Sequence, residues 1–133
     1  MADGLKVTTV LIVDDDEGIR ETLRFMLEDA GYGVIEAKNG IEALDVLRAS
    51  QQPMVVLLDV KMPALNGEQV LEAVVKDPHG LHRHAYVLVT ASPQAITPRM
   101  MELIAQLAIP FVPKPFGMDQ LLNTIERAVS RLG

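Results

Sequence analysis

The stretch "LLDVKMPALNG", residues 57–67, joins an apolar run to a turn and places one carboxylate between them. The leucines before Asp59 are typical of a buried strand, whereas Pro63 and the Asn66-Gly67 pair are turn residues. Asp59 therefore stands where a strand ends, which is where open α/β sheets place chemistry. From this segment alone, a chemical role for Asp59 and a simple role in capping the loop are about equally well supported.

The composition is that of one domain, which we take to span residues 1–133 with a core at about 8–132. Its 133 residues are 49% hydrophobic, enough for a core of that size. The absence of cysteine excludes disulfides and favours a reducing compartment. The apolar run at 10–13 is too short for a signal peptide or a membrane span. With a net charge of -6, we expect a soluble, cytoplasmic domain that does not bind nucleic acid or membrane directly.

Short apolar runs alternate with helical periodicity along the whole chain. Helices are expected after each run, and the one over 40–49 should turn Ile41, Leu44 and Leu47 inward. This alternation predicts an α/β fold, in which right-handed crossovers join a parallel sheet covered by helices on both faces. The expected strands are 9–13, 33–37, 54–59, 85–91 and 109–113, and the expected helices are 17–30, 40–49, 67–76, 98–107 and 118–132.

Polar residues stand at the carboxyl ends of four expected strands. These are the aspartates at 14–16, Asp59, Thr90 and Lys114. In a parallel sheet these ends share one edge, where clustered carboxylates require a cation if all are to stay ionised. Hard oxygen ligands suit magnesium, and a lysine and a hydroxyl beside it suit a phosphoryl group. Taken singly, the acids are also explained as a helix N-cap cluster, Lys114 as a surface lysine and Thr90 as a strand residue. Together, at four strand ends, they indicate a site.

The motifs "VLIVDDDEGIR" (10–20), "VVLLDVKMPALNG" (55–67), "VLVTAS" (87–92) and "FVPKPF" (111–116) occur in an order and at a spacing that match a known family. The sequence resembles the receiver domain of two-component response regulators, of the stand-alone type, over essentially its full length. The resemblance implies a flavodoxin-like, doubly wound sheet of five parallel strands in the order 2-1-3-4-5.

The resemblance also assigns the charged residues. It implies that Asp59 is the phosphoacceptor and that Mg²⁺ binds Asp14, Asp15, Asp59 and the backbone carbonyl of Lys61, with Asp15 a direct ligand. The domain is then a signalling module that assists its own phosphorylation and dephosphorylation, and not an enzyme.

Four further residues match the part of the family motif that contacts the phosphoryl group and switches. Lys114 would neutralise a phosphoryl oxygen, and Thr90 and the amide of Ala91 would contact others. Phe111 matches the switch aromatic, whose inward turn accompanies activation together with Thr90. Lys114-Pro115 matches the family's cis peptide.

The same resemblance implies partners. A sensor histidine kinase or a phosphotransfer protein would supply the phosphoryl group. The output would be a downstream protein or a homodimer, bound through the helix at 98–107, the strand at 109–113 and the helix at 118–132. In that helix at 98–107, Met101, Ala105 and Ala108 form a second apolar stripe, which either docks partners or widens the buried face.

The sequence departs from the commoner family pattern at two places. Pro110 and Pro113 remove backbone donors from the last strand, which suits an edge strand and stiffens the segment that should move. The stretch 77–86 carries His79, His82 and His84, for which we expect a solvated loop and assign no function.

Other classes fit less well. A haloacid-dehalogenase-like phosphatase needs an aspartate where Lys61 stands, and a nucleotide-binding domain needs a glycine-rich first turn in place of the aspartates at 14–16. A phosphate-independent binding module should lack part of the site. A receiver fragment of a larger transcription factor or hybrid kinase remains an alternative.

Overall fold

The computed structural model describes residues 7–77, 80–90 and 93–132. Within them, five parallel strands form one sheet in the order β2-β1-β3-β4-β5. This confirms both the expected fold class and the expected strand order. The strands are β1 (Thr9–Val13), β2 (Gly33–Ala37), β3 (Val55–Leu58), β4 (Ala85–Thr90) and β5 (Phe111–Pro113).

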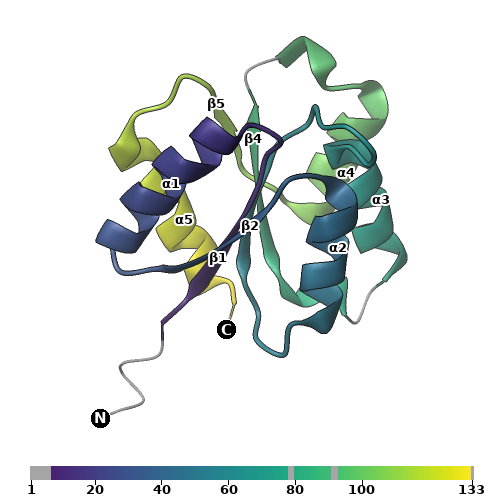
Figure 1. Ribbon diagram of the computed structural model, residues 1–133. Coiled ribbons are helices and arrows are strands. Elements are labelled where there is room, and N and C mark those ends of the chain that lie inside the picture. The colour runs from purple at the N-terminus through teal and green to yellow at the C-terminus, as the bar shows by residue number, and fades with distance from the viewer. Residues whose placement is uncertain (1–6, 78–79, 91–92, 133) are drawn as a thin grey trace.

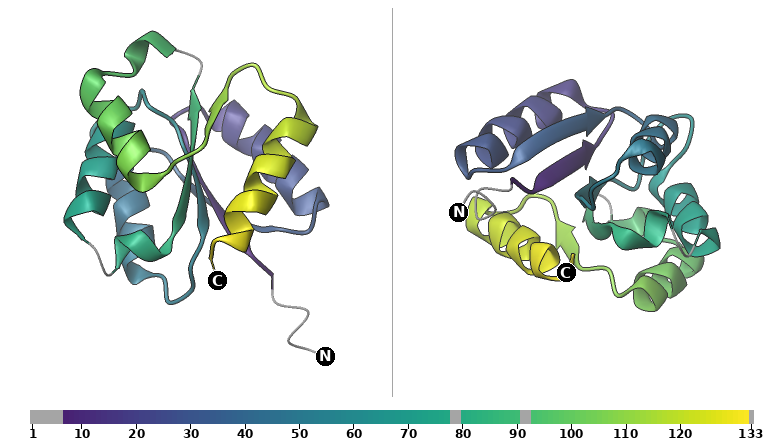
Figure 2. Two further views of the ribbon diagram at one scale, coloured as in Figure 1. Left: turned by 180° about the vertical axis from the view of Figure 1, so that it is seen from behind. Right: turned by 90° about the horizontal axis from the view of Figure 1, so that it is seen from below.

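Helices cover both faces of the sheet, as Figure 1 and the view from below in Figure 2 show. Helices α1 (Glu17–Asp29) and α5 (Met118–Ser130) lie on one face. Helices α2 (Gly40–Ala49), α3 (Gly67–Lys76) and α4 (Pro98–Leu107) lie on the other. Two short 3₁₀ turns, Leu81–Arg83 and Pro93–Ala95, precede β4 and α4. No helix in the described part of the chain combines the length and apolarity needed to cross a membrane.

Alternate residues of the central strands supply two separate cores. Leu11, Val56 and Leu88 pack under α2, α3 and α4, whereas Val10, Val55 and Val87 pack under α1 and α5. All six side chains are 0% exposed. A strand buried on both faces must be apolar throughout, and this explains why β1, β3 and β4 read as unbroken apolar runs in the sequence.

The structure corrects some expected bounds. Strand β5 begins at Phe111 instead of 109, although Pro110 still accepts a hydrogen bond from Leu88 through its carbonyl oxygen at 2.9 Å. As expected, β5 lies at the sheet edge, where missing proline donors are tolerated. Helix α5 ends at Ser130 instead of 132, and β3 contains neither Met54 nor Asp59.

The prediction that Ile41 points inward is wrong. Its side chain is 52% exposed, because the buried stripe of α2 consists of Gly40, Ala43, Leu44 and Leu47. These four positions follow the spacing i, i+3, i+4 and i+7, and Ile41 lies beside that stripe. The inward orientation expected for Leu44 and Leu47 is confirmed.

Candidate functional site

Three carboxylates meet at the carboxyl edge of the sheet. This edge is at the top of the ribbon in Figure 1. Oxygen atoms of Asp14, Asp15 and Asp59 all lie within 4.8 Å of one another. Asp14 directly follows β1 and is buried, Asp15 is exposed, and Asp59 directly follows β3. The Asp59 N–H donates to the carbonyl oxygen of Val13 at 3.0 Å, so the sheet pairing itself brings the two strand ends together.

Lys114 brings a positive charge into this cluster from the residue after β5. Its Nζ lies 3.0 Å from Asp14 Oδ2 and 3.9 Å from Asp59 Oδ2, and its side chain is only 16% exposed. The backbone N–H of Lys114 donates to the carbonyl oxygen of Thr90 at 2.8 Å, which holds the residue against β4. The Lys114-Pro115 peptide bond is cis.

The electrostatic state of Asp59 reflects both its burial and its neighbours. Burial raises the pKa of Asp59 to about 6, the nearby Lys114 ammonium opposes that rise, and the Asp14 carboxylate adds to it. Asp59 Oδ1 also accepts a hydrogen bond from the Val60 N–H at 2.8 Å. One ammonium therefore compensates the cluster incompletely, and a hard divalent cation fits the remaining oxygen donors.

The loops around the cluster are fixed by local capping. Asp16 is the N-cap of α1 and accepts from the Ile19 N–H at 3.1 Å. The N-cap explanation of the acidic run thus holds for Asp16, whereas Asp14 and Asp15 belong to the cluster. Across the edge, Gly67 opens α3 against the chain at Asp59, and a Cβ there would lie 2.6 Å from the Asp59 carbonyl oxygen. Only glycine permits this approach.

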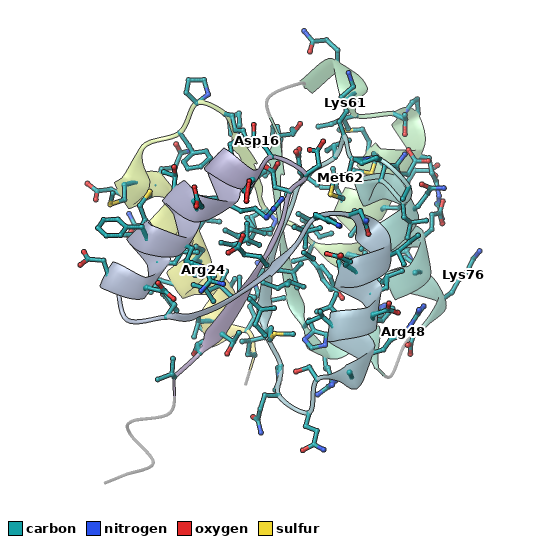
Figure 3. All side chains as sticks on the ribbon, in the orientation of Figure 1. Asp16, Arg24, Arg48, Lys61, Met62 and Lys76 are labelled. Atoms are coloured by element: carbon teal, nitrogen blue, oxygen red, sulfur yellow. The ribbon has the colours of Figure 1, made fainter. Side chains whose placement is uncertain are left out.

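Of the remaining candidate residues, Thr90 and Lys61 lie at the same edge, whereas Phe111 lies at the other end of its strand. Thr90 ends β4 and is 1% exposed, and Lys61, two residues after Asp59, lines a pocket together with Asp15. Figure 3 shows Lys61, Met62 and Asp16 at this end of the sheet. Phe111 opens β5 and is 37% exposed. Ala91, expected to contact the phosphoryl group through its amide, lies outside the described residues.

The expectation of a solvated loop is wrong for His84. Its side chain is buried, Nδ1 accepts from the Met54 N–H at 3.0 Å, and Nε2 faces the Leu47 carbonyl oxygen at 3.1 Å. This ring joins α2 to the residues that directly precede β3 and β4, at the end of the sheet away from Asp59. His82 is exposed, as expected of a solvated loop, and His79 lies outside the described residues.

The fold and this site define a class, and comparison with known proteins shows it directly. Residues 10–126 match the family described as the response regulator receiver domain, and the chain belongs to that family. Receiver domains are signalling domains of two-component systems, and Mg²⁺ at an acidic pocket is typical of them.

Particular relatives extend the comparison. Response regulator MprA of Mycobacterium tuberculosis is 36% identical over 122 residues, covering 92% of this chain and 50% of MprA. The chain thus spans about half the length of the curated relatives it matches. Among solved structures, chemotaxis protein CheY4 of Vibrio cholerae is 28% identical with a TM-score of 0.77, covering 92% of this chain and 99% of that one. Response regulator TrrA of Thermotoga maritima, in complex with Mg²⁺-BeF, is 29% identical with a TM-score of 0.76. The match covers 92% of this chain and 99% of TrrA.

Proposed function

We propose that this domain accepts a phosphoryl group on Asp59 from the phosphohistidine of a sensor histidine kinase or a phosphotransfer protein. The observation that carries the proposal is the position of the Lys114 ammonium, 3.0 Å from Asp14 and 3.9 Å from Asp59, at the edge where three carboxylates meet. This arrangement combines a nucleophile, a fixed cation and oxygen ligands for a second cation within one site.

The chemistry needs no further catalytic group from the chain. A carboxylate oxygen of Asp59 attacks phosphorus, the new P–O bond forms as the P–N bond breaks, and the imidazole leaves with the bonding electron pair and takes up a proton. Lys114 neutralises a phosphoryl oxygen during the transfer. Asp14, Asp15, Asp59 and the backbone carbonyl of Lys61 would hold Mg²⁺, which supplies charge neutralisation to the same oxygens.

The proposed switch runs along neighbouring strands. A phosphoryl group on Asp59 adds an acceptor at the sheet edge for the hydroxyl of Thr90 and the amide of Ala91. Strand β4 pairs with β5, with Thr90 opposite Pro113 and Leu88 opposite Phe111. A shift of Thr90 toward the phosphoryl group is therefore placed to change the packing of Phe111, on the surface formed by α4, β5 and α5.

The surroundings of the site support a protein as phosphodonor. A groove between α1 and the segment before α5 borders Lys114 and Asp16 and is lined mainly by apolar side chains. They include Ile19, Met26, Phe116 and Met118, the last 49% exposed. An apolar lining next to a charged reaction site suits a protein surface better than a small phosphorylated metabolite.

A small phosphodonor tests the proposal without the cognate kinase. We expect acetyl phosphate to add one phosphoryl group to the protein in the presence of Mg²⁺ and none in its absence, as measured by intact-mass spectrometry. Asp59→Asn should abolish the added mass, because the amide lacks a nucleophilic oxygen. Labelling that persists in Asp59→Asn, or that needs no divalent cation, would contradict the assignment. A wild-type chain that stays unlabelled yet binds its target would favour a phosphate-independent binding module.

A further inference from the structure

Arg20, near the start of α1, contacts the backbone of the acidic cluster, and its side chain is 14% exposed. Its guanidinium donates in two directions. Nε donates to Glu36 Oε1 at 2.9 Å, and Nη1 donates to the carbonyl oxygen of Asp14 at 2.7 Å. Glu36 also accepts from Arg24, whose Nε lies 2.6 Å from Oε2. Both arginines thus bind Glu36 on β2, but Arg20 alone of the two donates to the acidic pair.

The carbonyl held by Arg20 belongs to the peptide group that joins Asp14 to Asp15. A peptide group is planar, so fixing its oxygen fixes the orientation of the plane and the direction in which Asp15 starts. On the other side of Asp14, its N–H donates to the carbonyl oxygen of Ala37 at 3.1 Å. Residues of β2 and α1 therefore clamp the backbone of Asp14 from both sides.

Asp15 depends on this backbone more than Asp14 does. The Asp14 carboxylate is held by the Asp16 N–H at 2.9 Å and by Lys114 at 3.0 Å. The Asp15 side chain is exposed, and among the residues that the structure describes none donates a hydrogen bond to its carboxylate. Its place near Asp14 and Asp59 follows from the direction of the backbone, which the Arg20 contact sets.

We propose that Arg20 is a positioning residue for the divalent-cation site, which it supports by holding the peptide group between Asp14 and Asp15 while Glu36 holds the guanidinium. This inference rests on the proposed function, because it assigns Asp15 as a ligand of Mg²⁺. Groups that orient metal ligands typically contribute about 10- to 100-fold to metal affinity. Arg20 acts here through geometry, since its positive charge by itself opposes a cation nearby.

Arg24 supplies the matched control. Arg20→Met and Arg24→Met each remove one positive charge and one hydrogen bond to Glu36, but only the first removes the contact with the Asp14 carbonyl. Mg²⁺ affinity is measured by titration of backbone amide NMR signals, with folding checked by the spectra of the metal-free proteins. We expect the Kd of Arg20→Met to rise about 10-fold. That of Arg24→Met should change by less than about twofold. Loss of a cation alone would lower the Kd, so the expected change has the opposite sign.

Lysine variants keep the test decisive if Arg20→Met does not fold. Arg20→Lys keeps the positive charge and allows an ion pair with Glu36. A single ammonium group cannot reproduce the planar guanidinium, which donates to Glu36 and to the Asp14 carbonyl oxygen at the same time. We expect Arg20→Lys to weaken Mg²⁺ binding more than Arg24→Lys. Equal affinities in the Arg20 and Arg24 variants, with a wild type that binds Mg²⁺, would overturn the role of Arg20 alone. A wild type that binds no Mg²⁺ would overturn the proposed function and this inference with it.

Discussion

Asp59, the proposed nucleophile, is a carboxylate whose charge is disfavoured by burial. Its side chain is 13% exposed, and burial raises its pKa to about 6 from an ordinary value of 3.8. The folded protein therefore binds a proton at Asp59 more tightly than the unfolded chain does. Ionisation of this group costs no folding free energy below pH 3.8, and the cost is complete once the pH has risen through about 6.

We expect Asp59→Asn to stabilise the protein at neutral pH when divalent cations are removed. The amide keeps the shape of the side chain and removes the buried charge, so the free energy of unfolding should rise by about 1 to 2 kcal/mol above pH 6, a figure reduced for the screening that partial exposure allows. The gain should vanish near pH 4. Urea unfolding in EDTA at several pH values measures it.

The control for this experiment is Asp45→Asn, which replaces an exposed carboxylate on α2. This change should leave the pH dependence of stability as in the wild type. A free energy of unfolding that is equal for wild type and Asp59→Asn at every pH would show that ionised Asp59 costs the fold nothing. Added Mg²⁺ should reduce the difference between the two proteins, because the proposed cation site uses the Asp59 carboxylate of the wild type.

The His84 side chain links α2 to the residues that directly precede β3 and β4. His84 accepts from the Met54 N–H and faces the carbonyl oxygen of Leu47, at 3.0 Å and 3.1 Å. Burial lowers the pKa of His84 below its ordinary value of 6.5, although the hydrogen bond to Leu47 opposes this. The imidazole of His84 is therefore neutral in the folded protein above pH 6.5. Its contribution to stability is present above pH 6.5 and is lost as the pH falls through the lowered pKa.

We expect His84→Ala to lower the free energy of unfolding by about 2 to 3 kcal/mol at pH 7.5, because it leaves the buried Met54 N–H without its acceptor and opens a cavity. Between pH 7.5 and 5 the wild type should lose part of this advantage. His82→Ala, at an exposed position two residues earlier, should change stability by less than about 0.5 kcal/mol. Similar urea midpoints for the two alanine variants would contradict a structural role for His84.

His84 also marks where prediction from the sequence fails. The apolar runs predicted the strands of the sheet, because a strand that is buried on both faces is apolar throughout. The helical periodicity predicted the helices that cover the sheet. The strand ends predicted that Asp14, Asp59 and Lys114 share an edge, since parallel strands align their carboxyl ends. The two partners of His84 lie 30 and 37 residues away in the chain. A long-range hydrogen bond to the backbone has no periodicity, and the three neighbouring histidines suggested a loop instead.

The contact between Arg20 and the Asp14 carbonyl was missed for a related reason. Arg20 belongs to the same sequence motif as the acidic pair, Asp14 and Asp15. The second partner of its guanidinium, Glu36, comes from β2. An arginine on the first turns of a helix is usually a solvated residue, and only the register of β1 with β2 brings Glu36 opposite Ile12 and within its reach. The fold has to be known before this role can be seen.

Strand β5 connects the site with the proposed output surface, because Lys114 directly follows β5 and Phe111 begins it. Met101 is 59% exposed on α4, and Ala105 and Ala108 are exposed near it. Of the two interpretations of this apolar stripe, the buried one is therefore wrong. Phe111, 37% exposed on β5, is the aromatic residue of the proposed switch. Methionine suits surfaces that must repack against a partner, because its side chain is unbranched and polarisable.

We expect Met101→Glu to weaken self-association or target binding that depends on phosphorylation, by about 10-fold or about 1.4 kcal/mol, because it places a charge in an apolar contact. Sedimentation velocity with and without beryllofluoride, a phosphoryl mimic, measures self-association. Labelling of Asp59 by acetyl phosphate should proceed at nearly the wild-type rate, since Met101 lies outside the site. Phe25→Glu is the control, because Phe25 is 75% exposed on α1, over the opposite face of the sheet. If both variants respond to beryllofluoride as the wild type does and bind the target equally well, the α4 stripe is not the output surface. If Phe25→Glu weakens association as strongly as Met101→Glu, the added negative charge, and not the place of Met101, is responsible.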